Sequence, residues 1–368
     1  MTDQTMVAMS GGVDSSVTAW LLREAGEPIA GLFMKNWEDD DLDGACSAEE
    51  DAADARAVAD MLGIPFHARN FAMEYWESVF EEFLSELQAG RTPNPDVLCN
   101  REIKFKVFLE HARDLGAERM ATGHYARRAQ TDRGFQLLKG VDPDKDQSYF
   151  LYMLNQNQLE RARFPVGELH KSELRQIAEN AGLPTATKKD STGICFIGER
   201  NFDDFIDCYL TGKPGDILTT KGQRVGQHRG LIHYTLGQRR GLGIGGVRGF
   251  PDAPWFSVHK DLETNVLYVT QDTMDPHLCS TELTASRLTW VAGRAPQTDR
   301  PMHAKIRYRQ DDQAVAIIEL DETADLMQLR FEQQQRAVTP GQSVVLYDGD
   351  ECLGGGIIHD SNRHIPQH

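Results

Sequence analysis

The residues best placed to do chemistry near the start of the chain lie in segment 7–16, which reads VAMSGGVDSS. Its apolar beginning predicts the end of a strand, and Ser-Gly-Gly predicts a turn that only small residues allow. Apolar periodicity from Asp14 or Ser15 up to Gly26 predicts a helix with a C′ glycine. A strand, a small-residue loop and a helix N-terminus together form an anion site. The segment is neither a Walker loop nor a GxGxxG loop. It is either an ordinary strand-to-helix turn rich in Ser and Gly or another kind of phosphate-binding loop.

A second reactive segment is 92–101, TPNPDVLCNR. Its two prolines and two asparagines predict a rigid, irregular loop through Asp96, followed by a helix from about Leu98. That helix would place Cys99 in its first turn, where the dipole and the nearby Arg101 favour the thiolate. Asp96, three residues before the thiol, is close enough for proton transfer and is also a candidate helix N-cap.

A third segment, 190–199, reads DSTGICFIGE and holds Cys195 between two apolar residues. Alone, that pattern fits an inert buried thiol as well as a reactive one. Cys99 and Cys195 each follow a loop signal, so they could meet in one cleft without forming a permanent disulfide. The chain has no CxxC pair, which argues against a structural zinc site, an iron–sulfur cluster or a thioredoxin-like motif. A cytosolic setting with reduced thiols fits best. The six cysteines are residues 46, 99, 195, 208, 279 and 352.

The charge of the chain is uneven. Its 368 residues allow two or three domains, and the formal net charge is −17. Segment 38–60 holds ten acidic residues and one basic residue, whereas 217–250 holds six basic residues and no acidic one. The basic segment is either a solvated face or a nucleic-acid contact. No signal peptide or membrane-spanning run is present in the sequence. The six basic residues are Lys221, Arg224, Arg229, Arg239, Arg240 and Arg248.

Strands and helices alternate in the first part of the chain, which predicts a doubly wound parallel sheet. Ligands of such sheets bind beyond the carboxyl ends of the strands, so the loop at Ser10, Met34 and Gly123-His124 should converge. The expected strands after the first are 28–34, 65–71 and 119–122, and the expected helices after the first are 47–62, 74–89 and 100–115.

The pattern changes after Tyr125. A hairpin is expected over 127–138, two helices over 147–154 and 170–181, and a flexible or ligand-ordered loop over 241–254. Short alternating strands in 255–270 and from 283 onward predict a small β-barrel. We therefore expect three domains: a catalytic domain over 1–198, a small central domain over 199–275 and a C-terminal β-barrel domain over 276–368.

The motif SGGVDS resembles the PP-loop of the ATP pyrophosphatases, enzymes that cleave ATP between the α- and β-phosphates to adenylate a carbonyl oxygen. The segments TPNPDVLCN, ATGHYA, KDQSYFL, DSTGICFIGER and GLIHYTLGQRRG add a closer resemblance, to the bacterial tRNA-specific 2-thiouridylase family. The similarity extends over nearly the whole chain, to the terminal GGGII, and the cysteine segments are more specific than the PP-loop.

This resemblance implies an enzyme, a tRNA-uridine 2-sulfurtransferase. ATP, with Mg²⁺, would adenylate the C2 carbonyl oxygen of the wobble uridine and release pyrophosphate; a persulfide sulfur would then displace AMP. It implies that Cys195 carries the persulfide, that Cys99 is the partner nucleophile in a transient disulfide, and that Asp96 is the acid/base. The base would leave its stack to enter the pocket. No metal-ligating residues are implied.

The resemblance also implies the binding residues. The partners would be tRNAs of the Lys, Glu and Gln type and a persulfide donor, such as a cysteine desulfurase or a sulfur-relay protein. The basic segment would line the RNA groove, and the enzyme would be cytoplasmic with no membrane partner. The positions implied for ATP are Ala8, Met9, Ser10, Gly11, Gly12, Val13, Asp14, Ser15, Met34 and Gly123. The positions implied for tRNA are Asn94, Pro95, Asp96, His124, Lys145, Asp146, Gln147, Arg307, Tyr308 and Gln342.

Two other functions compete with this interpretation. An ATP-dependent amide ligase of the same superfamily would need an ammonia source, yet the sequence shows no glutaminase-like nucleophile elbow and such a reaction leaves both cysteines without a role. A non-catalytic tRNA-binding or nucleotide-sensing protein belongs to a different class. tRNA-dependent ATP–pyrophosphate exchange separates an enzyme from a binder, and sulfur incorporation separates a tRNA sulfurtransferase from a ligase.

Overall fold

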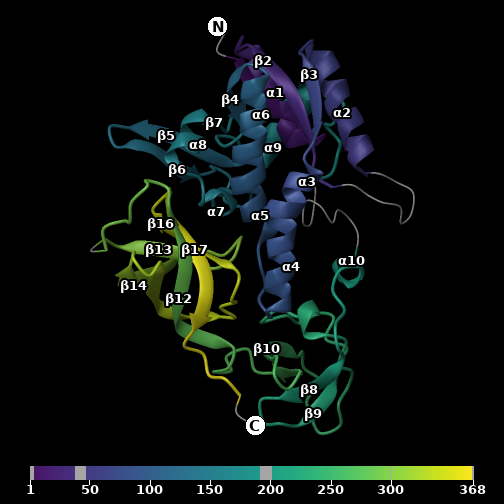
Figure 1. Ribbon diagram of the computed structural model, residues 1–368, viewed down its shortest axis with the longest axis vertical. Coiled ribbons are helices and arrows are strands. Elements are labelled where there is room, and N and C mark those ends of the chain that lie inside the picture. The colour runs from purple at the N-terminus through teal and green to yellow at the C-terminus, as the bar shows by residue number, and fades with distance from the viewer. Residues whose placement is uncertain (1–3, 38–46, 191–200, 299, 367–368) are drawn as a thin grey trace.

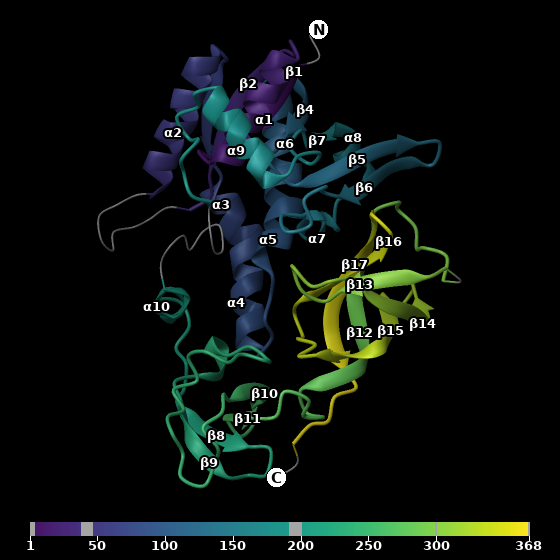
Figure 2. The same ribbon diagram turned by 180° about the vertical axis from the view of Figure 1, so that it is seen from behind.

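The computed structural model describes residues 4–37, 47–190, 201–298 and 300–366. Figure 1 shows an α/β domain at the top, a β-barrel to one side and a small β-domain at the bottom; Figure 2 shows the same arrangement from behind. Among the described residues, no helix combines the length and the hydropathy that a membrane-spanning segment requires.

The α/β domain is built on a five-stranded parallel sheet, which confirms the predicted fold class. The strand order is β3-β2-β1-β4-β7, so β1 lies in the middle. Apolar side chains of β1 alternate between two cores: Val7 packs with helices α1, α2 and α9, and Met6 packs on the other face. The strands are β1 (Gln4–Ala8), β2 (Ile29–Lys35), β3 (Phe66–Asn70), β4 (Ala117–Ala121) and β7 (Ala162–Arg163).

Most helices of this domain lie where the sequence predicts them, with three corrections. The helix expected over 147–154 is confined to α7 (Ser148–Leu151), and α8 (Gln156–Arg161) was not predicted. Gly26 follows α1 with a φ of 73°, as its C′ position requires. The expected helix 100–115 begins earlier, at Pro95, because proline is favoured at the first helical position. The helices are α1 (Val13–Glu24), α2 (Ser47–Leu62), α3 (Ala72–Tyr75), η1 (Trp76–Phe80), α4 (Glu81–Gln88), α5 (Pro95–Leu98), η2 (Cys99–Val107), α6 (Phe108–Asp114), α7 (Ser148–Leu151), α8 (Gln156–Arg161) and α9 (Lys171–Asn180).

The predicted hairpin is present as β5 (Ala126–Thr131) and β6 (Gly134–Lys139). It does not join the parallel sheet. Instead β6 pairs with β17 of the barrel, Leu137 opposite Cys352. A strand pair from the α/β domain therefore extends the barrel sheet.

The barrel consists of six antiparallel strands closed by the pairing of β12 with β17, as the sequence predicts. Buried hydroxyls attach it to the α/β domain: Tyr149 donates to the Ser343 carbonyl at 2.9 Å, and Ser148 Oγ lies 3.1 Å from the Tyr347 hydroxyl. The strands are β12 (Cys279–Trp290), β13 (Met302–Lys305), β14 (Gln313–Asp321), β15 (Leu326–Arg336), β16 (Ser343–Asp348) and β17 (Glu351–Ser361).

The small domain begins with α10 (Phe202–Asp207) and contains a four-stranded sheet of order β10-β11-β8-β9. The short strands expected over 255–270 therefore belong to this sheet and not to the barrel. Segment 241–254 carries neither helix nor strand, as its glycine content predicts. The strands are β8 (Gly215–Thr219), β9 (Arg224–His228), β10 (Phe256–Asp261) and β11 (Val266–Thr270).

Candidate active site

The loop between β1 and α1 is held by its own serines. The Ser10 amide donates to Ser15 Oγ at 3.1 Å, and Ser15 Oγ donates to the Gly12 carbonyl at 3.0 Å. Gly11 has a φ of 75°, which glycine adopts without strain. The N-cap of α1 is Gly12, which has no side chain that could accept a hydrogen bond from the first turn. The first-turn N–H groups of α1 can therefore bind an anion.

Gly123 lies directly against this loop. A Cβ atom at Gly123 would stand 2.8 Å from the Asp14 carbonyl carbon and 2.8 Å from the Ser15 nitrogen. Met34, half-buried, lies at the carboxyl end of the neighbouring strand β2. Gly123 and the loop of Ser10 therefore meet as the sheet topology predicts, and Met34 lies near the end of the strand that pairs with β1.

If the loop binds ATP as its resemblance to the PP-loop implies, Gly123→Ala is expected to raise the KM for ATP about tenfold or more, because an added methyl group must displace the backbone of the loop. Steady-state kinetics measures the change. Gly245→Ala is the control, since a Cβ there meets nothing within 4 Å. An unchanged KM in Gly123→Ala would contradict the expected close packing.

Asp14 lies at the centre of a group of charges that the sequence did not predict. Its Oδ1 accepts a hydrogen bond from the Tyr125 hydroxyl at 2.9 Å and one from Lys171 Nζ at 2.6 Å. Burial, and then the carboxylate of Asp14, raise the pKa of Tyr125, so the phenol stays a proton donor. No sequence motif indicated Lys171. It lies at the start of α9, 157 residues after Asp14, so only the fold shows that the two side chains meet.

Lys171 also binds Asp190, at 2.8 Å. Asp190 is further bound by Lys145 at 2.7 Å and Arg175 at 2.6 Å. Burial opposes ionisation of Asp190, but the hydrogen bonds and charges of Lys145 and Lys171 outweigh it and lower the pKa to about 2. Asp190 is therefore ionised at neutral pH and connects its segment to Lys145 and to helix α9.

Asp190→Asn is expected to reduce the free energy of unfolding by about 2 kcal/mol at pH 7. Because the folded pKa lies below the unfolded value, this contribution is complete above about pH 4 and is lost as the pH falls from about 4 toward 2. Urea denaturation of both proteins at pH 7 and near pH 3 measures it. A difference that stays constant between the two pH values would contradict the ionic origin.

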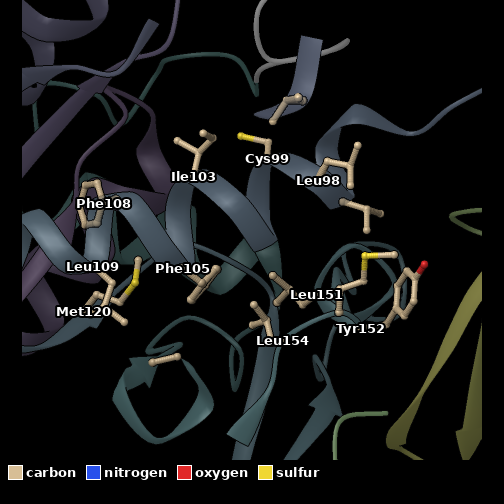
Figure 3. Close-up of a cluster of buried hydrophobic side chains, with 14 of the residues drawn as sticks. Leu98, Cys99, Ile103, Phe105, Phe108, Leu109, Met120, Leu151, Tyr152 and Leu154 are labelled. Atoms are coloured by element: carbon tan, nitrogen blue, oxygen red, sulfur yellow. The ribbon is translucent and has the colours of Figure 1, made fainter. Parts of the chain in front are cut away.

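The Cys99 segment differs from expectation in one respect. Because the helix begins at Pro95, Cys99 is its fifth residue and not part of the first turn. Asp96 lies in the first turn, and its i,i+3 spacing places it on the same helical face as Cys99. Cys99 is 0 % exposed and lies between Leu98 and Ile103 at one end of the core in Figure 3. Cys195 lies outside the described residues.

Thr92, two residues before Asn94, connects all three domains. Its amide donates to the Pro340 carbonyl at 2.9 Å, and its carbonyl accepts from Gln342 Nε2 at 2.7 Å, both from the barrel. Its hydroxyl lies 3.2 Å from that of Thr235 in the small domain. The barrel and the small domain thus fix the entry to the Cys99 helix.

Several positions implied for tRNA have internal contacts. Buried His124 has Nδ1 2.8 Å from Thr122 Oγ1, and burial, followed by the charge of Lys104, lowers its pKa well below the usual value. Asp146, 5 % exposed, accepts hydrogen bonds from the amides of Gly140 and Ser148. These contacts hold the loops after β4 and β6, and a direct contact with tRNA stays a prediction.

The remaining implied positions lie in the same region or in the barrel. The Gln147 side chain accepts from the Tyr125 amide at 3.0 Å, and Arg307 donates to the Arg336 and Ala337 carbonyls. The Tyr308 ring lies 4.5 Å from that of Phe150. Their role toward tRNA also stays a prediction.

The basic segment of the small domain is partly neutralised. Arg224 binds Asp216 at 2.7 Å, and Arg229 binds Asp203. The exposed members are Lys221, Arg239, Arg240 and Arg248, in addition to these paired arginines.

Three family descriptions match the chain in succession. Residues 3–199 match the tRNA methyl transferase HUP domain, 203–271 the tRNA methyl transferase PRC-barrel domain and 280–358 the aminomethyltransferase beta-barrel domain.

Curated relatives match almost from end to end. Proteins named tRNA-specific 2-thiouridylase MnmA are 57 % identical in Chromohalobacter salexigens (98 % of this chain, 94 % of that protein) and 58 % identical in Xanthomonas campestris (97 % and 94 %). Among solved structures, NMN synthetase from Francisella tularensis is similar with a TM-score of 0.35 and 18 % identity, covering 58 % of this chain and 80 % of that one. A 4-thiouridine synthetase–RNA complex with bound ATP is similar with a TM-score of 0.34 and 15 % identity, and the match covers 54 % of this chain and 46 % of that one.

Proposed function

Because the chain belongs to the tRNA-specific 2-thiouridylase family, we propose that it replaces the C2 oxygen of the wobble uridine of tRNA by sulfur, at the expense of ATP. The observation that supports this most is the arrangement around α1 and α5. The loop of Ser10 meets Gly123 with the carboxylate of Asp14 beside it, and Asp96 shares a helical face with Cys99. The proposed cytoplasmic location rests on the cysteines of the described residues, Cys99, Cys208, Cys279 and Cys352, which are free thiols.

The loop 8–15 would bind the phosphates of ATP, with Met34 beside the adenine. The absent side chains of Gly11 and Gly123 let the loop pack against the backbone of Asp51 and Gly123 against the loop, which fixes the loop's shape. The first-turn N–H groups of α1 complement the negative charge. Asp14 would supply a carboxylate oxygen of the kind that Mg²⁺ prefers, and the ion when bound would neutralise phosphate charge.

The proposed reaction has two stages. The C2 carbonyl oxygen of uridine attacks the α-phosphate of ATP, and pyrophosphate leaves. The terminal sulfur of a Cys195 persulfide then attacks C2, and AMP leaves with the former carbonyl oxygen. The Cys99 thiolate attacks the Cys195 sulfur, which frees the transferred sulfur as 2-thiouridine and forms a Cys99–Cys195 disulfide. Asp96 would move the proton of the base or of the Cys99 thiol, and an external thiol reductant restores the two cysteines.

A reconstituted assay tests the function directly. The protein is incubated with a tRNA carrying a wobble uridine, ATP, Mg²⁺ and a cysteine-desulfurase persulfide donor. We expect pyrophosphate release that depends on tRNA, and 2-thiouridine in the nuclease digest by mass spectrometry. Pyrophosphate release with no sulfur incorporated would favour a ligase, and binding without pyrophosphate release would favour a non-catalytic binder.

Charge reversal of Arg239 and Arg240 is expected to weaken tRNA binding and to flatten its dependence on salt. Both residues are exposed in the small domain, and each lost phosphate contact should reduce the log–log slope by about 0.7–0.9. Titrations at several salt concentrations measure the slope. Charge reversal of Arg224, which is paired with Asp216, provides a comparison in the same segment. An unchanged slope for the Arg239/Arg240 variant would show that these two arginines are solvated and do not contact tRNA.

A further inference from the structure

Two cavities flank the hairpin β5–β6, and the ring of Phe135 lines both. The first, of about 550 Å³, lies between the hairpin tip and the barrel; the second, of about 520 Å³, lies between the hairpin and the edge of the parallel sheet. Neither includes the Ser10 loop or Cys99. Figure 1 shows this hairpin projecting from the α/β domain above the barrel.

Arginines dominate both cavities in a chain whose net charge is −17. The carboxylates that line them are fewer: Glu118, Glu160, Asp348 and Glu351. The arginines are Arg133, Arg294 and Arg300 in the first cavity and Arg119, Arg128, Arg161 and Arg163 in the second.

The arginines of the two cavities differ in how far carboxylates compensate their charge. Arg161 binds Glu118 at 3.3 Å and Arg163 binds Glu27, so these two are paired. Arg128 donates to two neutral carbonyls, those of Leu159 and Glu160, at 2.8 and 2.7 Å. Burial, followed by the charges of Arg163 and Arg119, lowers the pKa of Arg128, as a positive local potential requires. Arg300 lies 3.9 Å from Asp348.

The hairpin that carries this surface is held rigidly. Gln156 accepts from the Phe135 amide at 2.8 Å and donates to the Phe135 carbonyl at 2.8 Å and to the Val291 carbonyl of the barrel at 2.7 Å. The Arg128 guanidinium stacks 4.9 Å from the Phe135 ring centre. Arginines on a fixed support lose little entropy when they bind, and the guanidinium fork matches a phosphate group.

We propose that the two arginine-lined cavities beside hairpin β5–β6 bind phosphates of the RNA backbone, as a docking surface separate from the ATP site and the basic segment of the small domain. The occupant is a polyanion with repeated phosphates, because two cavities that share Phe135 in their lining both offer guanidinium groups. The inference rests on the proposed function, which makes tRNA the substrate.

The test is the salt dependence of tRNA binding by the full-length protein. Arg119→Gln, Arg133→Gln and Arg294→Gln are combined in one variant, and the exposed Arg23, Arg113 and Arg330, outside both cavities, are changed to Gln in a control of equal net charge. We expect the first variant to lose between about 5-fold and about 100-fold in affinity at 0.1 M salt, with the slope falling by about 0.7–0.9 per lost contact, and the control to bind like the parent. ATP affinity, measured alone, should stay constant in both, which shows that the folded site is intact.

Equal slopes for the two variants would overturn the inference. So would an unchanged tRNA slope together with slower sulfur loading from the desulfurase, because the surface would then bind a protein. If the parent enzyme thiolates tRNA and the cavity variant binds tRNA as tightly as the parent, this inference is wrong and the proposed function stands. A parent that neither binds nor thiolates tRNA removes both this inference and the proposed function.

Discussion

Replacing Cys99 or Cys195 by serine is expected to reduce tRNA thiolation by at least about 10³-fold, with each variant stopping at a different step. Cys195→Ser should still adenylate tRNA, because the ATP site is intact, but it has no sulfur to transfer. Cys99→Ser should still accept a persulfide and then stall at sulfur release. Pyrophosphate release, persulfide labelling and 2-thiouridine content distinguish these steps.

Cys208→Ser is the matched control, because Cys208 is an exposed thiol outside the site and its loss should leave thiolation unchanged. Oxidation after a single turnover, followed by peptide mass mapping, should recover a Cys99–Cys195 bridge, which requires Cα atoms within about 7 Å at that stage. Full thiolation by Cys99→Ser or by Cys195→Ser over many turnovers would contradict the proposal that both thiols take part in sulfur transfer.

Asp14→Ala is expected to lower the adenylation rate at least about 100-fold while tRNA affinity stays close to that of the parent. The substitution removes the oxygen ligand proposed for Mg²⁺ and also the partner of Tyr125 and Lys171. ATP–pyrophosphate exchange measures the rate, and a filter-binding titration measures tRNA affinity.

Asp14→Asn separates charge from shape at this position. The amide oxygen can still accept the Tyr125 hydrogen bond but carries no charge for a metal ion. We expect this variant to be nearly as impaired as the alanine variant. Full exchange activity in the Asp14→Asn protein would reduce Asp14 to a structural role.

Local patterns predicted the elements that position the site. The buried strand before Ser10, the glycine ends such as Gly26 and the strand–helix alternation each depend on residues close in sequence. The convergence of Gly123 with the Ser10 loop then follows from parallel topology, since strand ends meet at one edge.

Contacts between distant residues could not be predicted in the same way. Alternation in 127–138 indicates a hairpin but not that β6 pairs with β17, because period two specifies a face and not a partner. Tyr125 and Lys171 reach Asp14 across separations of 111 and 157 residues. The start at Pro95 was missed because proline both breaks a helix interior and favours its first position, and the second property prevails here.

The pairing of β6 with β17, together with the bonds from Thr92 to Pro340 and Gln342, has a consequence for biosynthesis. While the ribosome has yet to deliver residues 340–361, the edge of β6 is unpaired and the backbone of Thr92 lacks its barrel partners. In a nascent α/β domain the loop of Ser10 can therefore form early, whereas the approach to Cys99 becomes fixed only when the last strand is made. An incomplete chain therefore lacks a fully ordered approach to Cys99.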